Sequence, residues 1–461
     1  MADNGAIAKT HEYLKENRDR FREELFDLLR IASISAKPDF AEHVRKSAEW
    51  VRARCETAGL RAEIVETAGH PAVIAEGEQK VGRPTMLVYG HYDVQPEGEL
   101  SLWKTGPFEP VVEDEKMVCR GAADDKGQMM CALLAAEAWL KTAGSLPINL
   151  KFLLEGEEEV GSPNLAPLVE KYKERLSCDY VLIHDTAQFG ENAPAVTTAT
   201  KGMVYKEVIL RGPQKDLHSG SFGGAVANPA NELAGLIASF HDSDWKVTIP
   251  KFYDRVREMS ADEVQMMKGL PYDEAALLAD LGSPTMFGES GYGSLQRRWA
   301  RPTLDVNGIY GGYMEAGSST IIPSFAGAKI SMRLVPDQDA AEIDRLFEEA
   351  VLARVPERVQ VEIKSHACCD PYLANLNSPG MKAARKAIES GFGKSPVLIR
   401  EGGSLPILPM FKGILGADSL MLGYCQPNCN AHSPNEFLHV RDFEAGMRST
   451  ASLFGLLDAG S

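Results

Sequence analysis

The stretch Met86-Leu-Val-Tyr-Gly-His-Tyr-Asp93 is an apolar run that ends in a glycine, a histidine and an aspartate. The run predicts a buried strand, and a strand of a parallel sheet delivers the residues at its carboxyl end to the edge where α/β folds bind ligands. His91 is therefore a candidate metal ligand. Asp93 can accept a hydrogen bond from the second imidazole nitrogen and thereby fix the tautomer of His91. Taken alone, the stretch is more typical of a histidine that only caps a strand.

The whole sequence of 461 residues has the composition of an ordinary globular protein, with 44% hydrophobic and 25% charged residues. Its length favours two domains over one. The net charge of −16 argues against nucleic acid and anionic membranes as partners, since both attract Lys- and Arg-rich surfaces. The N-terminus shows no signal-peptide pattern, and no apolar run has the length of a membrane span. We therefore expect a cytoplasmic protein whose eight cysteines are reduced.

Two further apolar segments also end in acidic residues. They are Ile148 to Leu154, which precedes Glu158 and Glu159, and Tyr180 to His184, which precedes Asp185. Parallel strands joined by crossover helices bring their carboxyl ends to one edge of the sheet, so we expect these acidic side chains near His91. Asp124 lies in a loop between the first two strands. Alternatively, Asp124 and Asp125 cap the next helix, and the glutamates form a surface charge run.

The order of predicted elements changes after about residue 200. Apolar spacing first predicts helices over 11–31 and 40–58, and then strands that alternate with helices, as in a parallel sheet covered by helices. After residue 200 the order is β-α-β-β-α-β, which is that of the ferredoxin-like split unit. We therefore predict an α/β fold with a mostly parallel sheet in two parts, 1–200 and 371–461. A ferredoxin-like α+β domain interrupts it at 201–370 and carries a polar insertion near 243–301.

The candidate ligands include one residue from late in the sequence. His432 follows the predicted strand Ser419 to Tyr424 and so reaches the same edge. The set has only nitrogen and oxygen donors, which suit zinc or manganese, and its members are His91, Asp124, Glu159, Asp185 and His432. If Asp124 bridges, each of two metals receives three protein ligands, with a hydroxide between ions about 3.5–4 Å apart. Such a centre suits hydrolysis, and Glu158 is the candidate base that passes a proton to the leaving amine.

Seven motifs in their order resemble those of the M20 metallopeptidases, most closely the carnosinase-like cytosolic nonspecific dipeptidases, over nearly the full chain. They are Gly90-His-Tyr-Asp-Val-Gln-Pro96, Arg120-Gly-Ala-Ala-Asp-Asp-Lys-Gly127, Glu155-Gly-Glu-Glu-Glu-Val-Gly-Ser162, Asp216-Leu-His-Ser-Gly220, Arg333-Leu-Val-Pro336, Arg400-Glu-Gly-Gly-Ser404 and Ala431-His-Ser-Pro-Asn-Glu436. The resemblance implies a dipeptidase with two divalent metal ions per subunit, zinc or manganese. It also implies a catalytic domain interrupted by a lid domain through which the chain forms a homodimer.

The resemblance assigns roles to individual residues. One metal would be held by His91, Asp124 and Asp185, and the other by Asp124, Glu159 and His432. Asp93 would orient His91, Glu158 would be the general acid and base, and the Asp124-Asp125 peptide bond would be cis. His218 would reach the partner subunit's active site and help to polarise the scissile carbonyl. Arg333 with Ser404, and Thr320 as a further candidate, would hold the substrate's carboxylate, while Glu401 would face its amino end.

Other interpretations share parts of this pattern. An N-acyl amino acid deacylase, a carboxypeptidase or another amidohydrolase of the same fold would keep every metal ligand, and only Glu401 and the insertion argue against it. A nucleotide-binding protein is suggested by Gly391-Phe-Gly-Lys-Ser395, but Ile388 stands where a phosphate loop has its first glycine. Cys425 and Cys429 with His432 could belong to a structural zinc site, for which a second ligand pair is missing.

Overall fold

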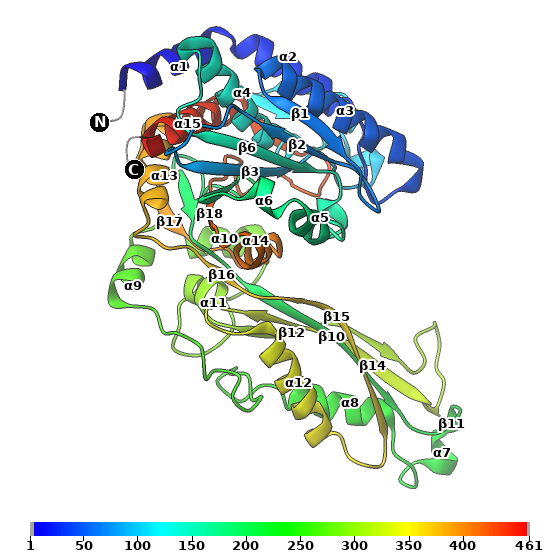
Figure 1. Ribbon diagram of the computed structural model, residues 1–461. Coiled ribbons are helices and arrows are strands. Elements are labelled where there is room, and N and C mark those ends of the chain that lie inside the picture. The colour runs from blue at the N-terminus through cyan, green and yellow to red at the C-terminus, as the bar shows by residue number, and fades with distance from the viewer. Residues whose placement is uncertain (1–3, 459–461) are drawn as a thin grey trace. The chain divides into compact units, whose positions relative to one another are not determined.

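Strand β3 (Thr85–His91) lies inside an eight-stranded sheet in the computed structural model, which describes residues 4–458 (Figure 1). In spatial order the strands are β1 (Arg61–Val65), β2 (Ala72–Glu76), β6 (Asn149–Glu155), β3, β7 (Tyr180–Ile183), β18 (Asp418–Met421), β8 (Ala195–Thr197) and β17 (Val397–Ile399). The strands β6, β3, β7 and β18 run parallel to one another. Antiparallel pairing joins β1 to β2, β2 to β6 and β8 to β18. The predicted mostly parallel sheet is therefore confirmed.

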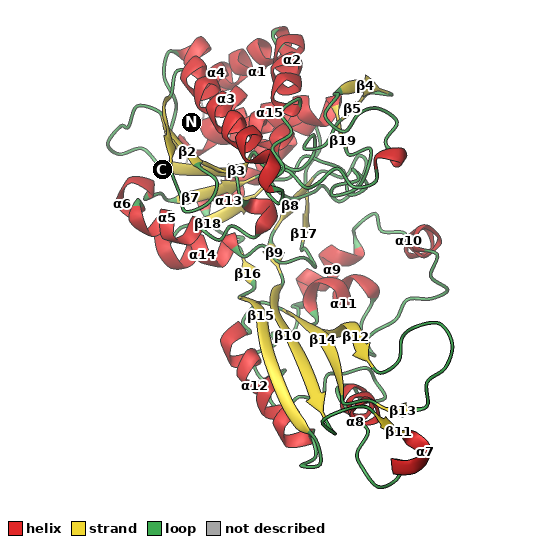
Figure 2. Cartoon of the chain, turned by 90° about the vertical axis from the view of Figure 1, so that its right-hand side faces the viewer, coloured by secondary structure: helices red, strands yellow, loops and turns green. Residues whose placement is uncertain are grey.

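Helices cover both faces of this sheet, which explains why β3 and β6 are buried along nearly their whole length. One face carries α1 (Asn4–Glu16), α2 (Arg18–Leu29), α3 (Ala41–Ala58), α4 (Lys126–Ala143) and α15 (Val440–Asp458), with α13 (Pro379–Phe392) packed on α15. The other face carries α5 (Leu165–Lys171) and α6 (Lys173–Leu176) (Figures 1 and 2). The single helix predicted over 11–31 is wrong. It is interrupted at Asn17, whose side-chain amide donates to the Tyr13 carbonyl at 2.9 Å.

A small antiparallel sheet joins early and late parts of the chain. In it, β19 (Phe437–His439) pairs with β5 (Lys116–Val118), which pairs with β4 (Val111–Glu113). The loop that carries Asp124 follows β5, and the loop that carries His432 precedes β19. The pairing therefore brings two predicted ligands together that are far apart in the sequence.

The second unit contains the predicted ferredoxin-like order of elements. These are β10 (Gly202–Arg211), α8 (Pro229–Ala238), β12 (Thr303–Gly311), β14 (Phe325–Leu334), α12 (Ala340–Arg354) and β15 (Gln360–Cys369). The sheet is antiparallel with the order β12-β14-β10-β15, and α8 and α12 pack against it (Figure 2). The apolar residues of these elements form the core of the second unit, including Val208, Leu233, Ile330, Leu346 and Phe347.

The boundary between the units differs from the predicted one in a short segment. The first unit runs to Thr198 and resumes at Ala374–Ile399 and from Met410, so that Arg400–Pro409 belongs to the second unit. Backbone hydrogen bonds explain this placement. The Glu401 N–H donates to the Ala199 carbonyl at 2.8 Å, and the Lys201 N–H donates to the Gly403 carbonyl at 3.0 Å.

The remaining elements are short. The insertion contains α9 (Ala261–Lys268), α10 (Glu274–Leu281) and α11 (Ser294–Ala300), and the rest are β9 (Ala199–Thr200), β11 (Leu217–His218), α7 (Ser219–Phe222), β13 (Ile321–Ile322), β16 (Tyr372–Leu373) and α14 (Ile407–Leu415). Among the described residues, no helix combines the length and the apolar composition that a membrane span requires.

Candidate metal centre

The carboxyl ends of three adjacent parallel strands carry several of the candidate ligands. His91 is the last residue of β3, Asp185 follows β7, and Glu158 and Glu159 lie in a short 3-10 turn just after β6. Strand β3 pairs with β6 so that His91 lies opposite Glu155. It pairs with β7 so that Met86 lies opposite Tyr180. The convergence predicted from the strand pattern is therefore present.

Among the described residues, six side chains form two groups of three that could each hold a metal ion. His91, Glu158 and Asp185 form one group, and Asp124, Glu159 and His432 form the other, each with its ligand atoms within 4.8 Å of one another. The second group consists of the three residues that were predicted to hold one of the two metals. In the first group, Glu158 stands where Asp124 was predicted, so a role as a metal ligand competes with its predicted role as a base.

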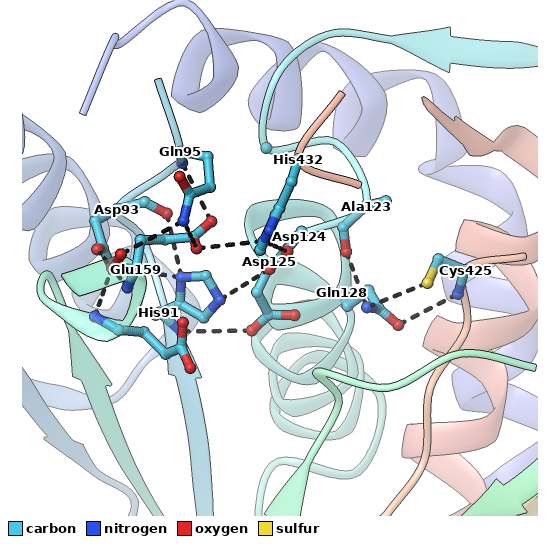
Figure 3. A network of polar contacts seen from close by, with 12 residues as sticks. His91, Asp93, Gln95, Ala123, Asp124, Asp125, Gln128, Glu159, Cys425 and His432 are labelled. Carbon is cyan, nitrogen blue, oxygen red and sulfur yellow. Dashed lines mark hydrogen bonds and ion pairs between the residues drawn. The ribbon is translucent and has the colours of Figure 1, made fainter. Parts of the chain in front are cut away.

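Asp124 lies between the two histidines. Its Oδ1 is 3.1 Å from His91 Nε2, and its Oδ2 is 2.9 Å from His432 Nε2 (Figure 3). His432 Nε2 also lies 3.3 Å from Glu159 Oε2. Because each carboxylate oxygen faces a different histidine, the geometry fits a carboxylate that bridges two ions.

Asp93 positions both His91 and the acidic pair. The Nδ1 of His91 is 3.1 Å from the Asp93 carbonyl oxygen and 3.4 Å from its carboxylate Oδ1, which leaves Nε2 for a metal. The Asp93 carboxylate also accepts the backbone N–H groups of Glu158 and Glu159 at 3.2 and 3.1 Å. One buried carboxylate therefore orients ligands from two strands.

Two supporting residues were not predicted. The buried carboxylate of Glu436 accepts Arg120 Nη1 at 2.8 Å and the backbone N–H groups of Gly121, Ala123 and Asp124 at 3.0, 2.9 and 3.0 Å. Gln95 donates to Glu159 through its backbone N–H at 3.1 Å and through its side-chain amide at 2.8 Å (Figure 3). Glu436 ends a motif that also contains His432, and this proximity was the only sequence signal for it.

The electrostatics of the centre favour bound cations. Burial raises the pKa of Glu158 to about 9, with contributions from the nearby Asp185 and Glu159 carboxylates. Burial likewise raises the pKa of Asp185 to about 7, and Asp124 adds to the effect. In the described part of the chain, neither Glu158 nor Asp185 forms an ion pair with a lysine or an arginine. A divalent cation beside such carboxylates would stabilise their ionised forms, so the donor set fits the implied metals.

Three other features considered from the sequence are the Asp124-Asp125 peptide bond, the two cysteines near His432 and the suspected phosphate loop. The Asp124-Asp125 peptide bond is cis, as the resemblance implied. Cys425 and Cys429 are buried free thiols, and neither belongs to the two ligand groups found among the described residues. Gly393, at the centre of the suspected phosphate loop, ends α13 in a left-handed conformation, whereas a phosphate loop precedes its helix.

The predicted substrate-binding residues lie in the second unit. Arg333 Nη1 donates to Ser404 Oγ at 2.7 Å, as expected for two groups that share a ligand. Burial raises the pKa of the nearby Glu401 carboxyl, while Arg298 opposes the shift. His218 and Thr320 lie together, since the Ser219 N–H donates to the Thr320 carbonyl at 2.9 Å.

Thr320 is not close to Arg333 within one subunit. Arg333 lies at the end of β14 that pairs with Met203, whereas Thr320 lies beyond the other end, where Phe325 pairs with Arg211. At the rise of an extended strand, the two ends are about 30 Å apart. Arg333 and Thr320 of the same subunit therefore cannot hold one carboxylate.

The fold and the two groups of histidine and carboxylate ligands define a metal-dependent hydrolase. Residues 87–455 match the peptidase family M20/M25/M40. The chain belongs to this family of metallopeptidases.

Its relatives include dipeptidases. The chain is 31% identical to the Cys-Gly metallodipeptidase of Candida albicans, over 95% of its own length and 94% of the relative's. It is 28% identical to the human Beta-Ala-His dipeptidase over 97% and 92% of the two chains. Among solved structures, it is similar to an M20 family metallo-carboxypeptidase of Sulfolobus solfataricus with a TM-score of 0.84 and 32% identity, covering 95% and 99% of the two chains. The similarity to the carnosinase-like branch is thus confirmed.

Proposed function

We propose that this metallopeptidase hydrolyses the peptide bond of dipeptides. The position of Asp124 between two histidines, at the shared edge of three parallel strands, is the observation that carries the proposal. Dipeptidases among the relatives, similar over nearly the full chain, support the substrate class.

The chain's own residues would divide the reaction among them. Two divalent ions, when bound by the two ligand groups, would lower the pKa of a water molecule and polarise the scissile carbonyl. The Glu158 carboxylate accepts a proton from the attacking water and delivers it to the leaving amine. Asp93 keeps His91 in the tautomer that presents Nε2, and Glu436 keeps the Asp124 loop in position.

The second unit would bind the two charged ends of the substrate. The Arg333 guanidinium, held by Ser404, is suited to the C-terminal carboxylate because it offers parallel N–H donors. Glu401 would accept the free ammonium group of the substrate. A site that needs both charges selects dipeptides over longer peptides.

The active enzyme would be a homodimer in which His218 acts on the partner subunit's substrate. The distance between the Thr320 and Arg333 ends of β14 supports this arrangement, since the two groups can meet on one substrate only if they come from different subunits. Several large apolar side chains are exposed near His218, on the edge strand β12 and in the loop after it, or at the start of β14, which is unusual for a free surface. They are Phe222, Val226, Ile309, Tyr313, Met314 and Phe325.

A carboxypeptidase is the second candidate, because the similar Sulfolobus solfataricus structure belongs to a metallo-carboxypeptidase. It would use Arg333 in the same way but would not need Glu401 at a free amino end. N-acyl amino acids are disfavoured for the same reason, because their amino end carries no charge.

A substrate panel tests the proposal. Protein stripped of metal with a chelator and then given zinc or manganese is incubated with free, N-acetylated and C-amidated dipeptides and with longer peptides that have a free carboxylate. We expect metal-dependent cleavage of free dipeptides only. Cleavage of longer peptides would establish the carboxypeptidase, and cleavage confined to the acetylated set would establish a deacylase.

A further inference from the structure

A cavity of about 370 Å³ lies entirely within the second unit, beside Arg333. The insertion, the start of β12 and the loop at Gly402 line it. Its volume is within the range of small-molecule sites, roughly 300–1,000 Å³. The proposed mechanism uses Arg333 but no other part of this cavity.

The lining of the cavity is strongly cationic. Its basic residues are Lys201, Arg297, Arg298, Arg301 and Arg333. The acidic lining residues are Glu289 and Asp305. The chain as a whole has a net charge of −16, whereas the charge at this cavity is positive. The cavity would therefore attract an anion.

Most of this positive charge has no carboxylate partner. Arg301 is neutralised, since it lies 2.7 Å from Glu289 and 2.8 Å from Glu258. By contrast, Arg297, Arg298 and Arg333 have no carboxylate within 4.0 Å in the part of the chain that the structure describes. The cavity therefore offers three guanidinium groups to a ligand.

Arg297 and Arg333 are held in place by neutral groups. Arg297 Nε donates to the Glu289 carbonyl at 2.8 Å, which leaves its remaining N–H donors available. A Cβ at Gly288 would lie 3.0 Å from Arg297 Cδ, so the glycine, with φ at +130°, leaves room for this side chain. Burial lowers the pKa of Lys201 to about 7; the Asp305 carboxylate opposes this shift, and Arg333 and Arg298 add to it.

One wall of the cavity is aromatic. Trp245 stacks on His241 with ring centroids 4.3 Å apart, and Phe287 meets Trp245 edge-on at 4.6 Å. Trp245 has φ at +59°, a left-handed conformation that is rare for a bulky residue and is often found at functional sites. Both Trp245 and Phe287 are exposed and can cover the methylene groups of a ligand.

We propose that this cavity receives the side chain of the substrate's C-terminal residue and selects glutamate or aspartate there. The inference rests on the proposed function, in which Arg333 holds the main-chain carboxylate of that residue. Arg297 and Arg298 then bind the side-chain carboxylate, for which a guanidinium group is the best protein partner. A neutral side chain of the same shape leaves these charges unpaired and is rejected.

The test compares glycyl-glutamate with glycyl-glutamine, which differ by one charge. We expect kcat/KM for the acidic peptide to be higher by roughly tenfold or more, mainly through KM. Arg298→Gln and Arg297→Gln should each bring this ratio close to one. The exposed Arg345 of α12 lies outside the cavity, and Arg345→Gln is the matched control that should keep the ratio.

The other outcomes separate a failure of this inference from a failure of the proposed function. Equal kcat/KM values for the two peptides in the wild-type enzyme would overturn the inference and leave the dipeptidase intact. Hydrolysis of no dipeptide would overturn the proposed function and the inference with it. Free glutarate should compete with glycyl-glutamate, whereas activation of glycyl-glutamine hydrolysis by glutarate would overturn the inference in favour of an effector site.

Discussion

The geometry is compatible with two different roles for Glu158. Its carboxylate is grouped with His91 and Asp185, so it could hold a metal or move a proton. We expect Glu158→Ala to lower kcat by about 10²–10⁴-fold, the usual contribution of a general acid and base. The metal content should stay near that of the wild type, because Asp124 can complete the ligand set of His91 and Asp185.

Steady-state kinetics and elemental analysis of the same preparation measure both quantities. The exposed Glu109 lies in the same unit outside the centre, so Glu109→Gln is the control for a lost carboxylate. A Glu158→Ala protein that has lost metal along with activity would identify Glu158 as a ligand instead.

Glu436 shows how a residue without direct contact to substrate can control the centre. Four hydrogen bonds converge on its buried carboxylate, and one of them comes from the backbone of Asp124. In Glu436→Gln, Arg120 would lose its only carboxylate partner among the described residues, so we expect a loss of about 3–5 kcal/mol in the free energy of unfolding. Metal affinity should fall by about 10–100-fold, as for other residues that orient ligands.

Denaturant unfolding and metal titration check this prediction. Glu113→Gln on β4 removes an exposed carboxylate of the same region and should change neither quantity. Unchanged metal affinity in Glu436→Gln would show that the Asp124 loop keeps its position without this carboxylate.

At the scale of elements, the start of α4 is fixed by a close backbone approach. A Cβ at Gly127 would lie 2.0 Å from the carbonyl oxygen of Ala122, which is backbone and cannot turn away. Gly127→Ala should therefore displace the loop that carries Asp124, destabilise the protein by about 1–3 kcal/mol and weaken metal binding.

Thermal unfolding with and without added metal measures this effect. Gly235 lies inside α8, and a Cβ added to it would meet no atom within 4 Å outside its own helix backbone, so Gly235→Ala is the matched control. It should stabilise the protein by up to about 1 kcal/mol, because alanine is the better helix former. If Gly127→Ala behaved like the control, the close approach would not position the loop.

The elements that are predicted well from the sequence are those with a clear hydrophobic pattern of their own. The strands β3, β6 and β7 are mostly apolar, and their ends predicted His91, Glu159 and Asp185 as neighbours. By contrast, α14 was not predicted, because Pro409 and Gly413 are unfavourable in a helix and only tertiary packing overrides them. β8 has three residues, too few for a pattern.

The residues that support the centre were not predicted, because no sequence pattern specifies them. Gln95 and Glu436 act through hydrogen bonds to groups whose positions depend on the complete fold, including the backbone N–H groups around Asp124. Neither has a periodic pattern that a sequence could reveal. The distance between Thr320 and Arg333 within one subunit likewise depends on the length and pairing of β14, which the sequence does not specify.

At the scale of the whole molecule, the residues proposed to contact substrate lie at two opposite ends of the second unit. Arg333 and Ser404 lie at one end of β14, and His218 and Thr320 lie beyond the other, about 30 Å away. A dipeptide spans only about 7 Å, so it cannot contact both ends of one subunit. In a twofold homodimer, the His218 end of each second unit can serve the partner subunit's substrate.

Mixing two inactive variants tests this arrangement. His218→Ala and Glu158→Ala should each be inactive or nearly so as homodimers, but in their heterodimer one site has an intact Glu158 and receives His218 of the partner subunit. Random exchange of subunits makes half of the dimers mixed, and each has one intact site, so we expect roughly a quarter of wild-type activity. Activity is measured after the mixed variants are dissociated and reassociated, with each variant treated alone as the control. If His218 served its own subunit, both sites of the mixed dimer would be defective, and no activity would return.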